Sequence, residues 1–382
     1  MRTALASLRR GARSGSSRAG AAPRLVLALA AAQVLACGGP LKQGTAPASA
    51  PPSAPAPAPS ASPGREGAPA KAPGPALPEA KAGASEPAEA AAVTEFPPPD
   101  FEPPSPRSAS PGDGHWTRFG PPSASERPGE APLIARTVVH PHPESRWIVV
   151  TVAAVDLRRV EIGLVAGTED LAWAKLPVGK DAGLVPSSVQ DRLVAVMNGG
   201  FQPKHGRWGM MASGVVVSPP REEGCTIALH ADGSVRLGPW SELSAARSSM
   251  TSFRQTPPCL VHDGALHPSL IAGRDKTWAG HAADLTTRRR SAAGIDRTGQ
   301  VLYYAIGEEA DPRWLAEGLR AAGATTALEL DINWYWTRFL LFGRADTGSL
   351  RVVDTLIPKM EHLANGYVER ASTRDFFFLA KR

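Results

Sequence analysis

The stretch Leu-Glu-Leu-Asp-Ile-Asn-Trp-Tyr-Trp, residues 328–336, joins an apolar run, two carboxylates and an aromatic cluster. Leu328 and Leu330 alternate with Glu329 and Asp331, which is the period of a β-strand. Side chains two residues apart on a strand point to the same face, so we expect the two carboxylates to lie together. The stretch therefore predicts a strand that presents an acid at its C-terminal end.

A helix is predicted immediately before this strand, over residues 311–322. Asp311 suits its N-cap, Pro312 suits its first turn and Gly323 suits its end. A helix, a tight turn and a strand ending in an acid form a common arrangement for presenting a catalytic carboxylate.

Most of the remaining chain from residue 133 to 382 has the composition of short strands separated by Gly and Pro turns. Strand-like runs lie at 133–141, 146–157, 160–167, 192–201 and 213–220, and strand–turn–strand units lie at 225–238 and 291–307. The predicted fold class is α+β: a single mixed, β-rich domain over 133–382 with few helices.

The N-terminal segment is typical of a secretory signal. Residues 1–36 hold six arginines and no acid, and all six arginines precede the apolar stretch 25–36. The run Val34-Leu35-Ala36-Cys37 resembles a bacterial lipobox, which implies cleavage before Cys37 and lipidation of its thiol. The alternative is an ordinary signal peptide with an incidental cysteine. We favour a lipid-anchored protein, exported to the outer membrane or the periplasmic face of the cell envelope.

Residues 37–132 are rich in Pro, Ala and Ser and predict a disordered linker that acts as a tether. Without residues 1–36, the 42 basic and 36 acidic residues of the whole chain become equal in number. A near-neutral mature chain lacks the electrostatic basis for nucleic-acid binding, so we expect no nucleic-acid partner.

Cys225 and Cys259 remain if Cys37 is lipidated. In an oxidising compartment they predict a disulfide, with two buried free thiols as the alternative.

Several segments carry candidate site residues. Asn198, Gly199 and Gly200 follow a strand, where glycines permit close approach of a ligand; the alternative is a plain turn. Trp208 and Gly214 flank another strand entry, and Trp208 is either a sugar platform or a core residue. Arg290 ends a run of three arginines; it is either a phosphate ligand or part of a solvated charge run.

In this order, the segments resemble the phosphodiester glycosidase family. The family's strand followed by Asn-Gly-Gly-aromatic is matched at 198–201, and its Gly-containing strand entry at 213–215. Its Arg-(Thr/Ser)-Ala-any-Gly is matched at 290–294, and its Ala-Leu-any-Leu-Asp at 327–331. The resemblance covers residues 133 to 382.

The resemblance implies hydrolysis of a sugar-phosphodiester bond, with a carbohydrate or sugar-phosphate as substrate. Arg290 is then expected to neutralise the phosphate, and Asp331 to stabilise the transition state or activate water, with Glu329 as its possible partner. Asn198 is expected to hold a sugar hydroxyl, and Trp334 or Trp336 to stack on a pyranose ring.

One departure from the family pattern leads to a rival hypothesis. The family's aspartate is usually followed by Gly-Gly and a Ser-containing turn, whereas here residues 332–336 follow. The alternative is a catalytically altered or inactive glycan-binding lipoprotein that uses Trp208, Trp334, Tyr335 and Trp336. No histidine pair has the spacing of a zinc peptidase, so we expect no metal ion and no cofactor.

Overall fold

An antiparallel sheet of eight strands organises the fold, in the order β1-β2-β3-β14-β13-β15-β11-β12. The computed structural model describes residues 95–121, 127, 129–273, 278 and 288–382, and all of them belong to one compact unit. In sheet order the strands are β1 (Thr117–Arg118), β2 (Ile134–Val139), β3 (Val149–Asp156), β14 (Val301–Ala310), β13 (Arg288–Ile295), β15 (Thr326–Glu329), β11 (Val261–His262) and β12 (Ala265–Leu266).

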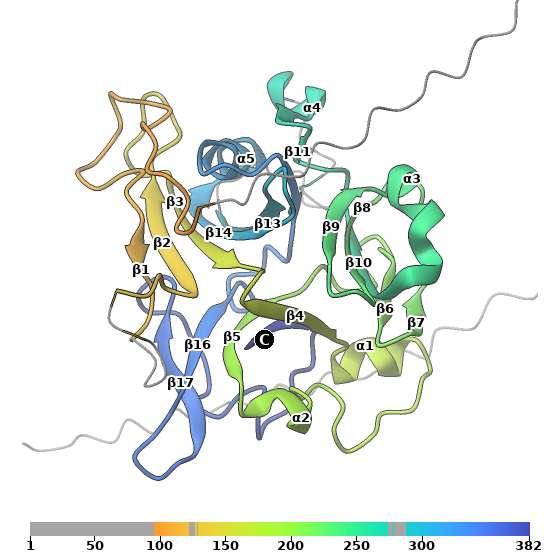
Figure 1. Ribbon diagram of the computed structural model, residues 1–382. Helices are drawn as coiled ribbons and strands as arrows, with labels where there is room; N and C mark the ends of the chain where they lie inside the picture. Colours follow the sequence, from red (N-terminus) through yellow and green to blue (C-terminus); the bar gives the residue numbers. More distant parts are fainter. Residues whose placement is uncertain (1–94, 122–126, 128, 274–277, 279–287) are drawn as a thin grey trace, which may run out of the picture. The chain divides into compact units, whose positions relative to one another are not determined.

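One face of this sheet is covered by helix α5 (Pro312–Ala321), as Figure 1 shows. The Asp311 carboxylate caps the helix by accepting a hydrogen bond from the Trp314 backbone N–H at 2.9 Å. Its buried face packs Leu315 and Leu319 into an apolar cluster that includes Val150 of the sheet. The predicted helix and its cap are therefore confirmed.

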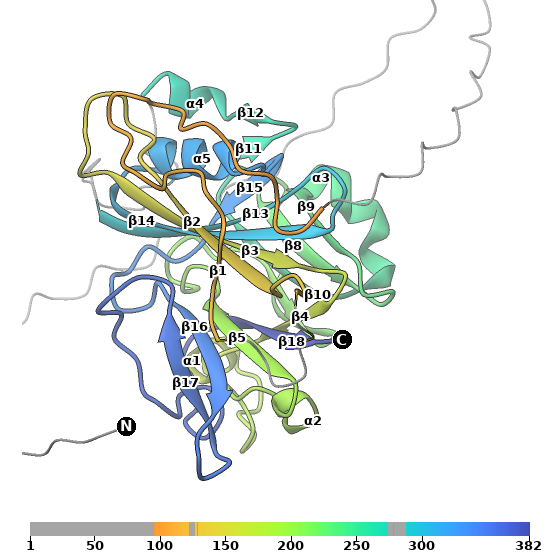
Figure 2. The ribbon, with the colours of Figure 1, turned by 60° about the vertical axis from the view of Figure 1, so that its left-hand side comes forward.

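The other face of the sheet packs on two further sheets, each of five antiparallel strands (Figure 2). The first has the order β17 (Leu350–Thr355), β16 (Phe339–Arg344), β5 (Leu193–Asn198), β18 (Phe376–Lys381) and β4 (Val160–Val165). The second has the order β7 (Val215–Ser218), β6 (Met210–Ala212), β10 (Met250–Thr256), β8 (Cys225–His230) and β9 (Val235–Pro239).

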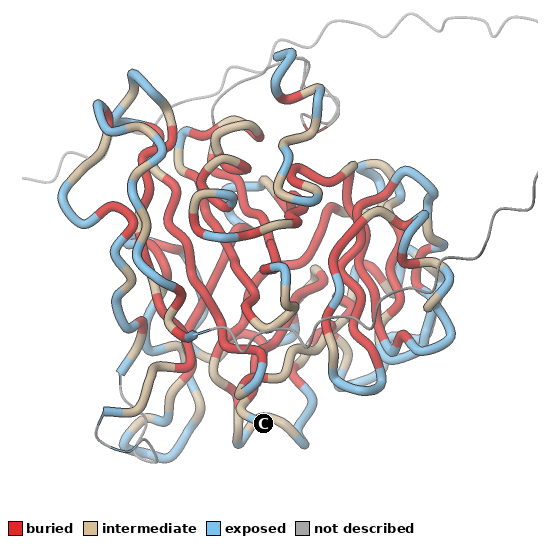
Figure 3. Tube along the Cα trace, turned by 45° about the horizontal axis from the view of Figure 1, so that its top comes forward, coloured by how far each residue is buried: buried red, intermediate tan, exposed pale blue. Residues whose placement is uncertain are grey.

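The largest apolar cluster lies among the three sheets, and Figure 3 shows buried residues following their strands. It combines Leu328 and Tyr304 of the eight-stranded sheet with Met197, Phe339 and Phe376 of the β5 sheet. The Phe-Phe-Phe run 376–378 thus forms a central strand and not a frayed C-terminal end.

The remaining helices are short: α1 (Thr168–Trp173), α2 (Ser187–Gln190), α3 (Trp240–Leu243), α4 (Pro268–Ile271) and the 3₁₀ turn at Ser244–Ser249. The prediction of one sheet-rich domain with few helices is confirmed for the described residues. Cys225 and Cys259 are joined by a disulfide with Cα atoms 4.8 Å apart, which is the first of the two predicted alternatives. No helix of the described residues has the length and apolarity needed to cross a membrane.

Residues 95–121, which the sequence analysis assigned to the linker, pack on the domain. The short strand β1 pairs with β2, and Phe96 and Phe119 are buried in the two main apolar clusters. Aromatic side chains supply the apolar area that the surrounding Pro/Ala sequence lacks. The predicted signal peptide 1–36, Cys37 and the linker up to residue 94 lie outside the described residues.

Candidate functional site

Asn198 ends β5 and ties three parts of the fold together. Its Nδ2 donates to Ser291 Oγ at 2.9 Å and to the Gly199 carbonyl at 2.9 Å. Its Oδ1 accepts from Tyr304 Oη at 2.6 Å and from the Arg338 backbone N–H at 3.0 Å. These four hydrogen bonds use the full capacity of the amide. The structure thus gives the Asn198 amide protein partners, and its contact with a sugar hydroxyl stays a prediction.

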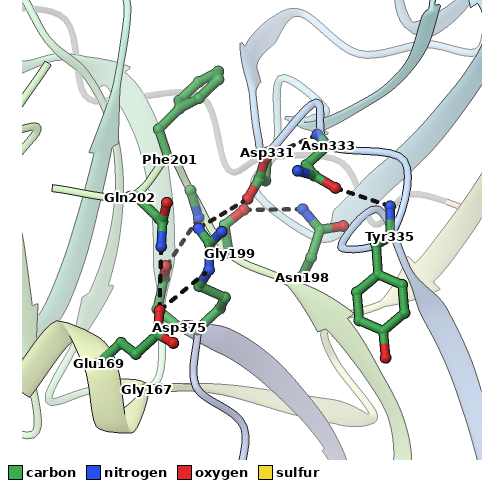
Figure 4. Close-up of polar contacts among 12 residues, drawn as sticks. Gly167, Glu169, Asn198, Gly199, Phe201, Gln202, Asp331, Asn333, Tyr335 and Asp375 are labelled. Carbon is green, nitrogen blue, oxygen red and sulfur yellow. Dashed lines mark hydrogen bonds and ion pairs between the residues drawn. The ribbon is translucent and has the colours of Figure 1, made fainter. Parts of the chain in front are cut away.

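The two glycines after Asn198 are required by what packs against them. A Cβ at Gly199 would lie 1.9 Å from Asp375 Oδ2, and a Cβ at Gly200 would lie 2.7 Å from the Arg254 guanidinium carbon. The Gly199 N–H donates to the Asp375 carbonyl at 3.0 Å, and the Gly200 N–H donates to Asp375 Oδ2 at 2.9 Å. The Gly-Gly turn therefore wraps around a carboxylate (Figure 4).

Arg254 on β10 and Asp375, just before β18, form a fully buried ion pair, with Nε and Oδ2 2.8 Å apart. The same guanidinium donates to the Phe201 carbonyl and, at 2.9 Å, to the Gln255 carbonyl. Neither residue was predicted from the sequence. A usable signal exists for Asp375, because an acid next to the apolar run 376–378 repeats the pattern of Asp331 next to its own strand.

Asp331 lies in a narrow pocket at this turn, which its own lining side chains almost fill. The pocket is lined from the chain segment after β5, from the loop after β15 and from the segment before β18, including Gly200, Asp331, Trp336, Arg374 and Asp375. The pocket thus collects residues far apart in sequence, and both the Asn-Gly-Gly motif and the predicted acid contribute to it.

The Asp331 main chain is fixed from two sides, since its N–H donates to the Gly199 carbonyl at 3.1 Å and its carbonyl accepts from Ser291 Oγ at 2.7 Å. Its Oδ1 accepts from the Asn333 N–H at 2.9 Å, and its Oδ2 lies 3.5 Å from Arg374 Nη1. Burial raises the pKa of Asp331 to about 6, against the lowering effects of the Asn333 N–H and the Arg374 charge. A carboxyl group with this pKa can exchange a proton near neutral pH.

Arg290 and Glu329 do not line this pocket. They pair with each other, with Nη1 and Oε1 2.7 Å apart, and both side chains are at most 1% exposed. Arg290 also donates to the Ala310 and Trp278 carbonyls, among the apolar residues beneath α5. Glu329 does not lie beside Asp331 as predicted, because β15 ends at Glu329 and the strand alternation stops there.

The aromatic residues after Asp331 form a loop backed by arginines. The Arg289 guanidinium lies 3.4 Å from the centroid of the Trp334 ring, and that of Arg338 lies 4.6 Å from the Tyr335 ring. Trp334 and Tyr335 remain 56% and 47% exposed. The two rings are therefore held in place while part of their surface stays open to a ligand.

Trp336 lies deeper and lines the pocket. The guanidinium groups of Arg338 and Arg374 lie 5.3 and 5.0 Å from its ring centroid. Arg338 Nε and Nη2 are buried and make no hydrogen bond within the described residues. Arg338 thus places positive charge against the loop, while the positive charge next to Asp331 comes from Arg374, which was not predicted from the sequence.

Trp208 and Gly214 do not line the pocket around Asp331. The Arg221 guanidinium covers the Trp208 ring at 4.6 Å from its centroid. Gly214 has a positive φ of 80° in the turn between β6 and β7, and its N–H donates to the Thr251 carbonyl. Gly214 serves the turn, and the Trp208 carbonyl accepts a hydrogen bond from Arg254 at 3.4 Å.

A second buried acid, Asp170 on α1, lies next to the Arg254–Asp375 pair. Its carboxylate accepts a hydrogen bond from the Gly167 N–H at 3.1 Å. Burial and then the charge of Asp375 raise the pKa of Asp170 to about 7, although Arg254 opposes the rise. This residue was not predicted from the sequence. Among the described residues, no group of His, Cys, Asp and Glu side chains has the arrangement of a metal site.

Part of the chain matches a known protein family. Residues 191–331 match the family model described as phosphodiester glycosidase. This range contains the Asn-Gly-Gly turn, Arg254, Ser291 and Asp331, and it ends before Arg338, Arg374 and Asp375. No curated protein matches the chain.

Three solved structures are similar over about two thirds of the chain. The catalytic domain of zebrafish N-acetylglucosamine-1-phosphodiester alpha-N-acetylglucosaminidase, auto-inhibited by its pro-peptide, is 16% identical with a TM-score of 0.43, covering 66% of this chain and 85% of that one. A hypothetical protein from Synechocystis is 12% identical with a TM-score of 0.38, covering 65% and 62%. A putative exported protein from Burkholderia pseudomallei is 12% identical with a TM-score of 0.34, covering 61% and 74%.

The family match and the predicted motifs agree in position, because the pocket acid and the turn that holds it both fall inside the matched range. Residues 191–331 therefore form a region similar to the phosphodiester glycosidase family, which is the family that the sequence motifs predicted.

Proposed function

We propose that this protein is a hydrolase that cleaves the glycosidic bond of a sugar phosphodiester. The observation that carries the proposal is the buried Asp331, held against the Asn-Gly-Gly turn with a pKa raised to about 6 and an arginine 3.5 Å from its carboxylate. An ionisable acid beside a cation suits a substrate that carries both a sugar and a phosphate. The family match supports the same reaction class.

Arg374 is the residue best placed to hold the phosphate. Its Nη1 lies 3.5 Å from Asp331 Oδ2, its Nε lies 3.9 Å from Glu169 Oε2, and its side chain lines the pocket. Both ion-pair contacts are long, so the guanidinium retains capacity for phosphate oxygens. Arg338, with two buried nitrogens that lack a hydrogen-bond partner within the described residues, adds positive charge on the same aromatic ring. Arg374 thus takes the role of phosphate ligand that the sequence motifs predicted for Arg290.

The proposed reaction breaks the bond between the anomeric carbon and the phosphate-ester oxygen. The phosphomonoester leaves with the bonding electron pair, and a water oxygen forms the new bond to the anomeric carbon. Asp331 transfers a proton in this exchange, either from the attacking water or to the leaving oxygen. The products are a free sugar and a phosphomonoester.

The test is a panel of sugar-1-phosphodiesters incubated with the purified chain, with release of the phosphomonoester as the measurement. We expect turnover of at least one member and none of the matching sugar glycosides that lack phosphate. Equal hydrolysis of glycosides without phosphate, or no turnover at all, would contradict the proposal.

One observation favours a binding function as the second candidate. Trp334 and Tyr335 are about half exposed beside the pocket, and the loop that carries them replaces the Gly-Gly turn of the family pattern. Exposed aromatic rings are suited to stacking on sugar rings. Calorimetry with the same panel separates the two functions, because binding without product release would identify a glycan-binding protein.

We also propose that the domain is tethered to the cell envelope by a lipid on Cys37, on the basis of the basic and apolar segment before it and the Pro/Ala/Ser-rich segment after it. Labelling with a palmitate analogue in a bacterial host tests this. We expect label on the native chain and its loss in Cys37→Ser; equal labelling of both would exclude lipidation at this residue.

A further inference from the structure

The buried pair of Arg254 and Asp375 has features that packing alone does not require. Both side chains are at most 2% exposed. Removing two charges from water costs several kcal/mol per ion, and apolar residues of similar volume are often as stable or more stable at such positions. The location of the pair, against the turn that holds the pocket acid, indicates a role in the site.

A continuous chain of contacts joins this pair to Asp331. Asp375 Oδ2 accepts from Arg254 Nε at 2.8 Å and from the Gly200 N–H at 2.9 Å, while the Asp375 carbonyl accepts the Gly199 N–H at 3.0 Å. The Gly199 carbonyl in turn accepts the Asp331 N–H at 3.1 Å. The position of the Asp375 carboxylate is therefore linked through one turn to the main chain of the pocket acid.

We infer that Asp375 is a positioning residue, which together with Arg254 holds the Gly199–Gly200 turn and sets the protonation of Asp331. The effect on rate rests on the proposed function, but the effect on Asp331 itself does not.

The charged groups around Asp331 come from several segments. Arg374 and Asp375 precede β18, Arg254 lies on β10, and Asp170 on α1 faces the Arg254–Asp375 pair. The charge of Asp375 raises the pKa of Asp331, whereas Arg374 and Arg254 lower it. Neutralising Asp375 removes the raising charge and leaves Arg254 without its main counter-ion. Both changes act in the same direction and favour the ionised form of Asp331.

The experiment follows the carboxyl carbon of Asp331 by ¹³C NMR against pH in the full chain labelled at aspartate, with the signal assigned by Asp331→Asn. We expect the titration midpoint to fall by about one pH unit in Asp375→Asn. Asp346→Asn, which alters an exposed aspartate, is the matched control and should leave the midpoint unchanged. A midpoint in Asp375→Asn equal to that of the native chain would overturn the inference.

Two further measurements keep the test decisive. Asp375→Ser also removes the charge, and it should lower the midpoint as well if Asp375→Asn fails to fold. In the native chain, the Gly199 and Gly200 amides should exchange with solvent far more slowly than that of Gly348 in an exposed turn; equal rates would remove the contacts that carry the inference.

Enzyme kinetics then separate this inference from the proposed function. The limb of the pH–rate profile that reports Asp331 should shift to lower pH by the same amount in Asp375→Asn. If neither the native protein nor any variant turned over substrate, the proposed function would be rejected. The Asp331 titration midpoint measured by NMR would still test the inference. A purely structural role for Asp375 would lower the folded fraction without moving either midpoint.

Discussion

Two buried arginine–carboxylate pairs lie within this domain and have similar geometry, yet different surroundings. Arg290 and Glu329 are 2.7 Å apart beneath α5, among apolar side chains. Arg254 and Asp375 are 2.8 Å apart against the Gly199–Gly200 turn. The first pair joins two strands of one sheet, and the second fixes the turn that holds Asp331.

The difference teaches that burial and ion pairing do not by themselves identify a functional residue. Arg290 also donates to the carbonyls of Ala310 and Trp278, away from the pocket. Arg254 satisfies its donors with carbonyls next to the pocket, including that of Phe201. Variants of these groups should therefore separate loss of stability from loss of activity.

The largest effect is expected from Asp331→Asn. The amide keeps the shape of the side chain but cannot transfer a proton near neutral pH, so kcat should fall by about a thousandfold. Turnover of the best sugar phosphodiester measures the loss, and circular dichroism shows whether the fold is retained. Activity within a few-fold of the native chain would remove Asp331 from the chemistry.

The next effect concerns the other pair. Glu329→Leu leaves the Arg290 charge buried without its carboxylate, and should lower the free energy of unfolding by about 3–5 kcal/mol. Urea unfolding measures this. The kcat of the folded protein should stay within about twofold of the native value, because the pair does not line the pocket.

The double variant Arg290→Met with Glu329→Leu is the control for that prediction, since it removes both charges and should recover most of the lost stability. A large fall in kcat of the folded double variant would show instead that this pair acts in the site.

A smaller effect is expected from Arg374→Gln. If Arg374 holds the phosphate, its loss should raise KM by about tenfold or more, in line with the strength of a charge-assisted contact. It should also raise the titration midpoint of Asp331, because the Arg374 charge lowers the pKa of Asp331. Arg370→Gln, at an exposed position nearby, is the matched control and should change neither quantity.

The last effect is a change in the pH dependence of stability, and it is small at any single step of pH. The pKa of Asp170 is raised from its ordinary value near 4 to about 7, so the folded state favours the protonated carboxyl. Its contribution to stability is complete below about pH 4 and is lost as pH rises towards 7, with a slope of at most about 1.4 kcal/mol per pH unit.

Asp170→Asn cannot titrate, so its free energy of unfolding should vary less steeply between pH 4 and 7 than that of the native chain. Urea unfolding at several pH values in this range measures the slope. Identical slopes in the two chains would show that Asp170 is not protonated on folding.

The sequence by itself determined the local structure well. The Asp311 cap, the strand alternation before Asp331 and the Asn-Gly-Gly turn follow from short-range patterns, because backbone hydrogen bonding and side-chain period act over a few residues. These patterns also indicated the family, since all of its motifs lie between residues 198 and 331.

Only the tertiary structure decided which charged side chains meet. On β13 a shift of one residue changes the face of the sheet, so Ser291 contacts Asn198 and the Asp331 carbonyl while Arg290 points beneath α5. Asp375 accepts a hydrogen bond from the Gly200 N–H, although the two residues are 175 positions apart in the chain. No local period encodes such a contact, because it depends on how three sheets pack together.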